Sequence, residues 1–98
     1  MLHLVNKSPS ERNTLDAVLR IAQSGSLLLI EDGVYAATRG NAAEERLRSA
    51  MAQLRVYALL PDLEARAVAD RIIDGVTTVD YAGFVDLVAG HPNCQSWL

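Results

Sequence analysis

Residues 26–37, SLLLIEDGVYAA, are the stretch that decides the fold class. The apolar run at 27–30 is unbroken, whereas a half-buried antiparallel strand would alternate apolar and polar residues. Such a run is typical of a central parallel strand that helices cover on both faces. Ligands of open α/β sheets bind beyond the carboxyl ends of the strands, which is where Asp32 would stand. The stretch therefore predicts an α/β fold and makes Asp32 the first residue to test for function.

The segment before this stretch predicts a strand at 2–5 and then a helix with two alternative starts. Ser8 and Glu11 could form a capping box around Pro9, or the helix could begin at Asn13. One apolar helix face follows at i, i+3, i+4 and i+7, and Gly25 is expected to end the helix; the face comprises Leu15, Val18, Leu19 and Ala22.

The segment after it continues the alternation of helices and strands. A short helical turn is expected at 34–38, broken by Gly40, and then a helix that Asn41 and Glu44 cap. The buried stripe of that helix comprises Leu47, Ala50, Met51 and Leu54. Strands are predicted at 55–60 and 76–79, with a short helix at 61–68 between them.

Asp80 should cap a last helix that Gly90 closes and that turns Phe84, Val85 and Val88 inward. The tail at 91–98 is either a fifth edge strand or a segment docked on a partner. The whole pattern predicts one domain, residues 1–98, with a parallel sheet of four to five strands. Helices on both faces and right-handed crossovers would complete a small three-layer α/β fold.

Composition points to a chain that associates with other proteins. Half of the residues are apolar, only 21% are charged, and the mean hydropathy is +0.11. We expect part of this surface to be buried against partner subunits; the alternative is an alanine-rich chain that tolerates apolar residues at its surface.

Charge and sequence pattern exclude several classes of protein. A net charge of −3 argues against direct binding to nucleic acid or to an anionic membrane. No apolar run approaches a membrane span, and the N-terminal residues lack the pattern of a secretory signal. A single cysteine excludes an internal disulfide and a multi-cysteine zinc site. These features predict a cytoplasmic protein.

Catalytic motifs are not evident in the sequence. Asp32 could bind a ligand or act as a base, but Asp-Gly also favours turns and Asp caps helices. No glycine-rich or Walker-type phosphate loop follows the first predicted strand, and no acidic pair of a phospho-receiver is found there. His3 and His91 flank no recognisable nucleophile motif. We predict no metal site and no cofactor.

Two further groups have a functional and a structural interpretation. Cys94 could carry a persulfide if its pKa were lowered, and His91 would help if the tail were helical; the alternative is an incidental tail cysteine, since no Lys or Arg follows Gly90. The arginines at 39, 46, 48 and 55 could form a basic patch, but a solvated helix face beside Glu44 and Glu45 explains them better.

Four blocks in this order resemble the TusB/DsrH family of sulfur-relay subunits: LHLVNKSPSERNTL, LLLIEDGVYAA, VYALLPDLEARA and VDYAGFVDLV, followed by a terminal Trp-Leu. The resemblance implies a DsrE/F/H-like fold and a heterohexamer with TusC/DsrF-like and TusD/DsrE-like subunits. Such a complex takes persulfide sulfur from a small carrier protein and passes it on. In the Tus branch the sulfur reaches the wobble uridine of tRNA as 2-thiouridine, and in the Dsr branch it serves sulfur oxidation.

The resemblance also implies that this chain is a non-catalytic subunit. The principal sulfur-bearing cysteine of the complex belongs to the TusD/DsrE-like subunit. Some DsrH-type members carry a cysteine in the first helix, where this chain has Val18, and this departure favours the tRNA branch. The contact surface with a sister subunit is then expected at the edge after the second strand and at the tail, at Glu31, Asp32, Gly33, Tyr35, Ala36, Ala37 and Trp97.

Three alternatives stay open: a Dsr-type relay in sulfur oxidation, a sulfurtransferase that uses its own Cys94, and a monomeric ligand-binding module built on the Asp32 edge. The isolated chain could also form a homo-oligomer through its apolar surface.

Overall fold

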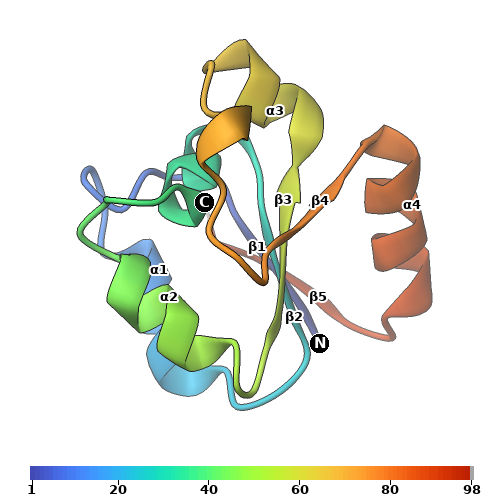
Figure 1. Cartoon of the computed structure of the whole chain (residues 1–98). Helices are drawn as coiled ribbons and strands as arrows, with labels where there is room; N and C mark the ends of the chain where they lie inside the picture. The colour runs from blue at the N-terminus through green and yellow to red at the C-terminus, as the bar shows by residue number, and fades with distance from the viewer. Residues whose placement is uncertain (98) are drawn as a thin grey trace.

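A computed structural model describes residues 1–97, and Leu98 lies outside the described residues. The last position of the predicted domain 1–98 and of the predicted tail is therefore not covered. Five strands alternate with helices along the chain (Figure 1). The elements are β1 (Leu2–Val5), α1 (Thr14–Ile21), β2 (Ser26–Leu29), the 3-10 helix η1 (Glu31–Ala37), α2 (Glu44–Ala50), β3 (Arg55–Leu59), α3 (Leu60–Ala65), the 3-10 helix η2 (Ala69–Arg71), β4 (Thr77–Val79), α4 (Tyr81–Gly90) and β5 (Cys94–Trp97).

The five strands form one parallel sheet in the order β4-β3-β2-β1-β5. Residues 27–29 of the apolar run lie in the central strand β2, whose four residues are all buried, as a strand covered on both faces requires; Ile30 follows the strand and is half-buried. Of the two interpretations of the tail, the edge strand is confirmed, because β5 pairs with β1. The predicted α/β architecture with helices on both faces is confirmed as well.

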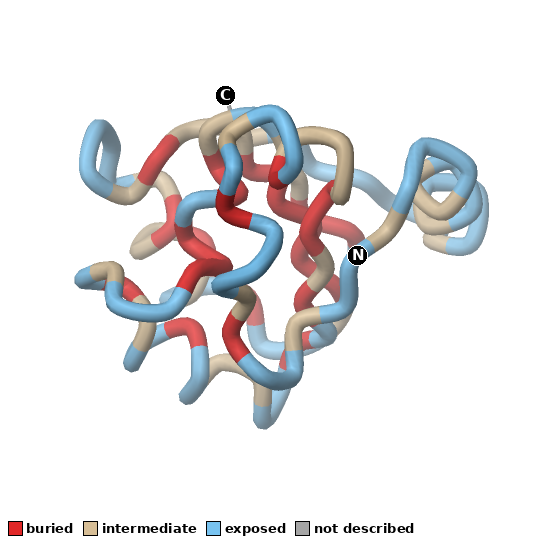
Figure 2. Tube along the Cα trace, turned by 45° about the horizontal axis from the view of Figure 1, so that its top comes forward, coloured by how far each residue is buried: buried red, intermediate tan, exposed pale blue. Residues whose placement is uncertain are grey.

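The main core lies on one face of the sheet. Alternate residues of the inner strands, such as Leu27, Leu29 and Val56, pack there against α1, α2, α3 and η1. The apolar faces predicted for the first two helices supply Leu15 and Leu47 to this cluster. In Figure 2 the buried segments gather in the interior of the molecule, and the exposed segments lie around them.

The other face of the sheet carries α4 alone. Ser26 and Leu28 point to this face, and His91, which follows α4, hydrogen-bonds Ser26. The inward orientation predicted for Val85 and Val88 is wrong, because these side chains are 64% and 40% exposed. Phe84 is half-buried, and none of the ten residues of α4 is fully buried. The helix packs beside β4 through one side only, and no other helix of residues 1–97 covers its outer side (Figure 1).

The boundaries of α1 show which capping signals operate. The helix begins after Asn13, and Ser8 instead closes a single turn in which its carbonyl accepts from the N–H groups of Glu11 and Arg12. The helix ends at Ile21 and not at Gly25, whose φ of +101° belongs to the following turn. A β-carbon at Gly25 would overlap the carbonyl oxygen of Met1, so close approach of the backbones requires glycine here.

The other predicted caps shape turns of the chain. The Asp80 side chain accepts from the Gly83 N–H at 2.8 Å, as expected of the α4 cap. Asn41 lies two residues before Ala43, the N-cap of α2; its side chain accepts from the Ala43 N–H and donates to the carbonyl of Thr38. The short turn predicted at 34–38 is the longer 3-10 helix η1, and the helix predicted at 61–68 ends at Ala65.

Candidate functional site

Asp32 lies where the sequence places it, in η1 just beyond the carboxyl end of β2. Its carboxylate forms an ion pair with Arg66 at 2.9 Å from Nε to Oδ1. The same guanidinium donates to the Asp62 carbonyl through Nη1, so the pair joins η1 to α3. A carboxylate that is already paired with arginine is a poor general base. The arrangement favours a structural role for Asp32 over a catalytic one.

Asp62 fixes the backbone at the start of η1. Its Oδ2 accepts from the Glu31 N–H at 2.6 Å, and Glu31 has a φ of +50°, which a non-glycine residue rarely adopts. On its other side, η1 packs against the end of β1 at Gly33, where a β-carbon would overlap the carbonyl oxygen of Val5. The edge is thus held by α3 on one side and by the end of β1 on the other.

Several of the residues predicted to contact a sister subunit lie inside this chain. Gly33, Ala36 and Ala37 are buried, and the two alanines belong to the main core. Their assignment to a contact surface is corrected: the small side chains allow η1 to approach its own sheet closely. Glu31 and Tyr35 are exposed, so only this outer side of η1 is accessible to a partner.

Trp97, the remaining residue of that predicted surface, is partly buried against the core. Its indole Nε1 donates to Nδ1 of His3 at 3.2 Å, and the two rings lie 6.2 Å apart. Because the indole is only a donor, His3 must accept through Nδ1 and carry its proton on Nε2. Burial, and secondarily the positive N-terminus, lowers the pKa of His3 below its ordinary value of 6.5. The contact ties β5 to β1 with a neutral histidine.

Cys94 opens β5 and its side chain is exposed. Its neighbour across the sheet is Leu2, an apolar residue. The predicted help from His91 is not available, because that ring contacts the Leu87 carbonyl at 2.6 Å and the Ser26 hydroxyl at 3.0 Å. Nothing in this geometry activates the thiol.

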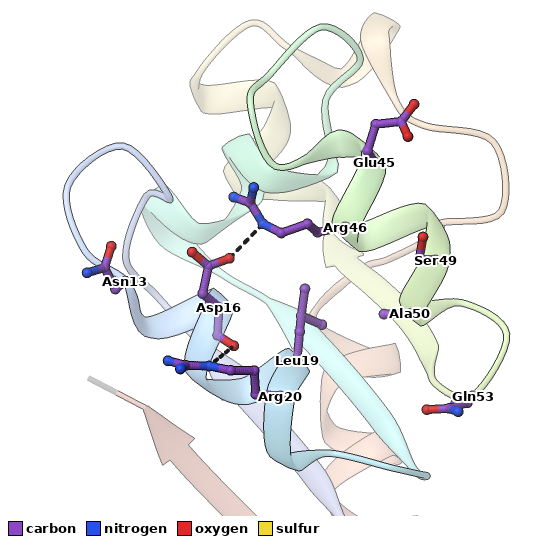
Figure 3. A pocket seen from close by; sticks show the side chains of 9 residues that line it. All are labelled: Asn13, Asp16, Leu19, Arg20, Glu45, Arg46, Ser49, Ala50 and Gln53. Atoms are coloured by element: carbon purple, nitrogen blue, oxygen red, sulfur yellow. Dashed lines mark hydrogen bonds and ion pairs between the residues drawn. The ribbon is translucent and has the colours of Figure 1, made fainter.

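Two hollows lie on the helical side of the sheet. The first, of about 750 Å³, is a groove between α1 and α2 that the Asp16–Arg46 ion pair crosses at 2.7 Å (Figure 3). The second, of about 380 Å³, lies near the carboxyl ends of β1 and β2 and is lined by Ser8, Tyr35 and Thr38 among others. Asp32 lines neither of these two hollows.

Three of the four arginines have polar partners, and the fourth, Arg55, lies apart from them on β3. Arg46 pairs with Asp16, Arg48 pairs with Glu44, and Arg39 donates to the Asp70 carbonyl. This agrees with the prediction of a solvated, charge-compensated helix face. Among residues 1–97, no cluster of three or more metal-ligating side chains is found, and no helix has the length and apolar character needed to cross a membrane.

Sequence inspection missed the partners of Asp32 and His91. Arg66 lies 34 residues from Asp32, and Ser26 lies 65 residues from His91, so no local spacing connects them. The apolar character of α4 is visible in the sequence. The segment YAGFVDLVAG carries one charged residue in ten, whereas a helix with one side in solvent usually carries more.

Comparison with known proteins places this geometry in a family. The DsrH family model, described as "DsrH like protein", matches residues 7–94. Protein TusB of Escherichia coli strain K12 is 41% identical over 98 residues, covering 99% of this chain and 100% of that protein. TusB of Escherichia coli O81 strain ED1a matches at the same identity and coverage.

Solved structures agree on the fold. The crystal structure of the ychN protein from E. coli superposes with a TM-score of 0.84 at 19% identity, over 97% of both chains. MTH1491 from Methanobacterium thermoautotrophicum, a protein of unknown function, gives a TM-score of 0.76 at 15% identity, over 97% of this chain and 95% of that one. The match of the family model, together with full-length similarity to TusB, shows that this chain belongs to the DsrH family.

Proposed function

We propose that this chain is a TusB-type, non-catalytic subunit of a cytoplasmic sulfur-relay complex that serves 2-thiolation of the wobble uridine in tRNA. The observation that carries the proposal is the 41% identity to TusB over 99% of this chain and 100% of that protein. The sequence resemblance and the family match point in the same direction.

The site geometry supports a subunit that works through contact. The Asp32 carboxylate is neutralised by Arg66, and the Cys94 thiol is exposed beside an apolar neighbour. Val18, at the position where some DsrH-type members have a cysteine, is fully buried in the core. This chain therefore has no thiol at that position, and the family resemblance assigns the sulfur-bearing cysteine to the TusD/DsrE-like subunit.

The partners in this proposal are TusC/DsrF-like and TusD/DsrE-like subunits, with small persulfide carriers acting indirectly. Glu31 and Tyr35, on the outer side of η1, are the accessible part of the contact surface expected there. Tyrosine combines apolar contact area with a polar end and is enriched at such surfaces.

The experiment is complementation of a strain that lacks its own TusB-type gene. The chain is expressed with the TusC-like and TusD-like chains of its own organism, and 2-thiouridine in tRNA is measured by mass spectrometry of nucleosides. Restored thiolation supports the proposal. Assembly without any thiolation, in cells that oxidise sulfur through the same complex, would favour the sulfur-oxidation relay instead.

A sulfurtransferase that uses Cys94 is the alternative from another class, and the exposure of the thiol is the observation that keeps it testable. Exposure of the assembled complex to a persulfide donor, followed by mass spectrometry, decides between them. A persulfide on the sister subunit's cysteine with Cys94 unmodified supports the contact role.

A further inference from the structure

We infer that the second hollow, of about 380 Å³, is a binding site for a free α-amino acid in its zwitterionic form. The loop between β1 and α1, the 3-10 helix η1 and the start of α2 enclose it. In this site the guanidinium of Arg46 binds the carboxylate of the ligand and Glu11 binds its ammonium group. The site is separate from the proposed relay function and does not depend on it.

The second hollow lies at the place where open α/β sheets usually bind ligands. The chain runs from β1 through β2 and β3 to β4 on one side of β1, and β5 then pairs on the other side, so the strand order reverses at β1. Ligands bind outside the carboxyl ends of the strands at such a reversal. Residues 8–11, which follow β1, line the hollow together with Tyr35 and Thr38, which follow β2. Its volume is near the lower end of the range of ligand pockets, about 300–1,000 Å³, so the ligand is small.

Two buried hydroxyl groups line this hollow. Ser8 and Thr38 are each 7% exposed, and they are two of the four polar residues that are buried in residues 1–97. Thr38 Oγ1 donates to the Tyr35 carbonyl at 2.7 Å, so its lone pairs remain available as acceptors. The hydroxyls of Ser8 and Ser10, 2.9 Å apart, share one hydrogen bond, which leaves one of their two protons free to donate. This spare hydrogen-bonding capacity favours a polar ligand over an apolar one.

Arg46 offers the free end of its guanidinium to a ligand. Its Nε forms the ion pair with Asp16 at 2.7 Å, and the residue lines both the α1–α2 groove and the second hollow. In Figure 3 the two Nη atoms lie on the side of the guanidinium that faces away from Asp16, and neither donates a hydrogen bond within residues 1–97. An arginine held through Nε presents its Nη groups as a planar fork that matches a carboxylate. The ligand is therefore expected to carry a carboxylate.

Glu11 adds a negative charge to the wall of the same hollow. Arg46 and Glu11 are the only charged residues among those that line it, and the exposed Glu11 forms no ion pair within residues 1–97. A purely anionic ligand would be repelled by Glu11, and Asp16 already compensates part of the charge of Arg46. A ligand with one positive and one negative group satisfies both residues. The small apolar residues of the wall, Ala42 and Ala43, leave room for an uncharged side chain.

The test is titration of the isolated full-length chain with L-valine, followed by calorimetry and by amide chemical shifts in NMR spectra. We expect saturable binding with a Kd of about 1 mM or lower, and shifts concentrated in residues 6–13, 31–46 and their neighbours. Isovalerate lacks the ammonium group of valine and isobutylamine lacks its carboxylate. Each should bind about 10-fold more weakly than L-valine or worse, because one charged contact is lost.

Two pairs of variants assign the charged contacts. Arg46→Gln should weaken L-valine binding about 10-fold or more. Its control is Arg48→Gln in the same helix, since Arg48 pairs with Glu44 and lines neither hollow. Glu11→Gln should weaken binding of L-valine without weakening that of isovalerate, and Glu64→Gln, an exposed carboxylate of α3, should bind like wild type. Circular dichroism checks that each variant is folded.

Three results would overturn the inference. The first is the absence of saturable L-valine binding to wild type up to about 10 mM. The second is equal affinity of Arg46→Gln and Arg48→Gln for L-valine. The third is binding of isovalerate or inorganic phosphate as tight as that of L-valine, which would make the hollow a simple anion site. None of these measurements involves tRNA thiolation, so their failure leaves the proposed function untouched.

Discussion

Gly33→Ala tests the packing of η1 against the end of β1. Gly33 is outside the left-handed φ region, so alanine meets no backbone strain there and the cost is purely steric. Its β-carbon would overlap the Val5 carbonyl oxygen and lie 3.0 Å from the carbonyl carbon, which are both backbone atoms and cannot swing away. The same oxygen accepts the Ile30 N–H at 3.0 Å, so relieving the overlap disturbs this hydrogen bond.

The expected magnitude follows from these contacts. Overpacking of this kind costs about 1–3 kcal/mol, and a weakened backbone hydrogen bond adds about 1 kcal/mol. Loss of glycine freedom in the unfolded chain offsets about 0.4–1 kcal/mol. We expect a net loss of about 1–3 kcal/mol in the free energy of unfolding, which for a domain of this size lowers Tm by roughly 5–20 °C.

Urea denaturation of the isolated chain, followed by circular dichroism, measures this change. Gly90→Ala is the control, because Gly90 is also helical but nothing lies within 4 Å of its β-carbon position. The control should be neutral or stabilising by a few tenths of a kcal/mol, up to about 1 kcal/mol. Equal urea midpoints for Gly33→Ala and Gly90→Ala, at the same m-value, would refute the close approach of η1 and β1.

Three further predictions address pH dependence and the candidate site. The folded state lowers the pKa of His3, so between that pKa and 6.5 the unfolded chain binds more protons, and the free energy of unfolding should fall as pH drops below 6.5. Fluorescence of Trp97, the sole tryptophan, follows this transition in urea; a His3→Gln variant with the same pH slope from 7 to 5.5 would contradict it. Arg66→Met removes an ion pair that is partly solvent-exposed, and should cost about 1 kcal/mol or less in a thermal melt without affecting tRNA thiolation; a loss of thiolation in a folded, assembled variant would restore a functional role for the Asp32 edge. Cys94→Ser should leave thiolation in the complementation strain unchanged within about twofold, since the exposed thiol lacks an activating neighbour; complete loss of thiolation would favour the catalytic alternative.

The sequence by itself determined the α/β class, the central position of 27–30, and the order of helices and strands. An unbroken apolar run avoids exposure to water only where both faces of the strand are covered. The run of apolar residues therefore specifies the buried environment of β2. Local capping chemistry was equally direct at Asp80, whose partner Gly83 is three residues away.

Tertiary structure decided which signals were used. Ser8 and Asn13 offered comparable helix starts, and only the packing of Leu15 against the sheet selects the later one. Asp32 was a catalytic candidate until Arg66, 34 residues away, was found beside it. The small residues of η1 predict an external surface, whereas the structure uses them for close approach to the chain's own sheet.

The same distinction applies to α4. Its apolar pattern predicts burial. The pattern does not indicate whether the surface that covers the helix belongs to this chain or to another. The helix packs beside β4 through one side, and the apolar residues Tyr81, Val85 and Val88 on its other side stay exposed. The apolar residues of α4 predict that the helix is buried. The three-dimensional packing shows that this chain buries only one side of it.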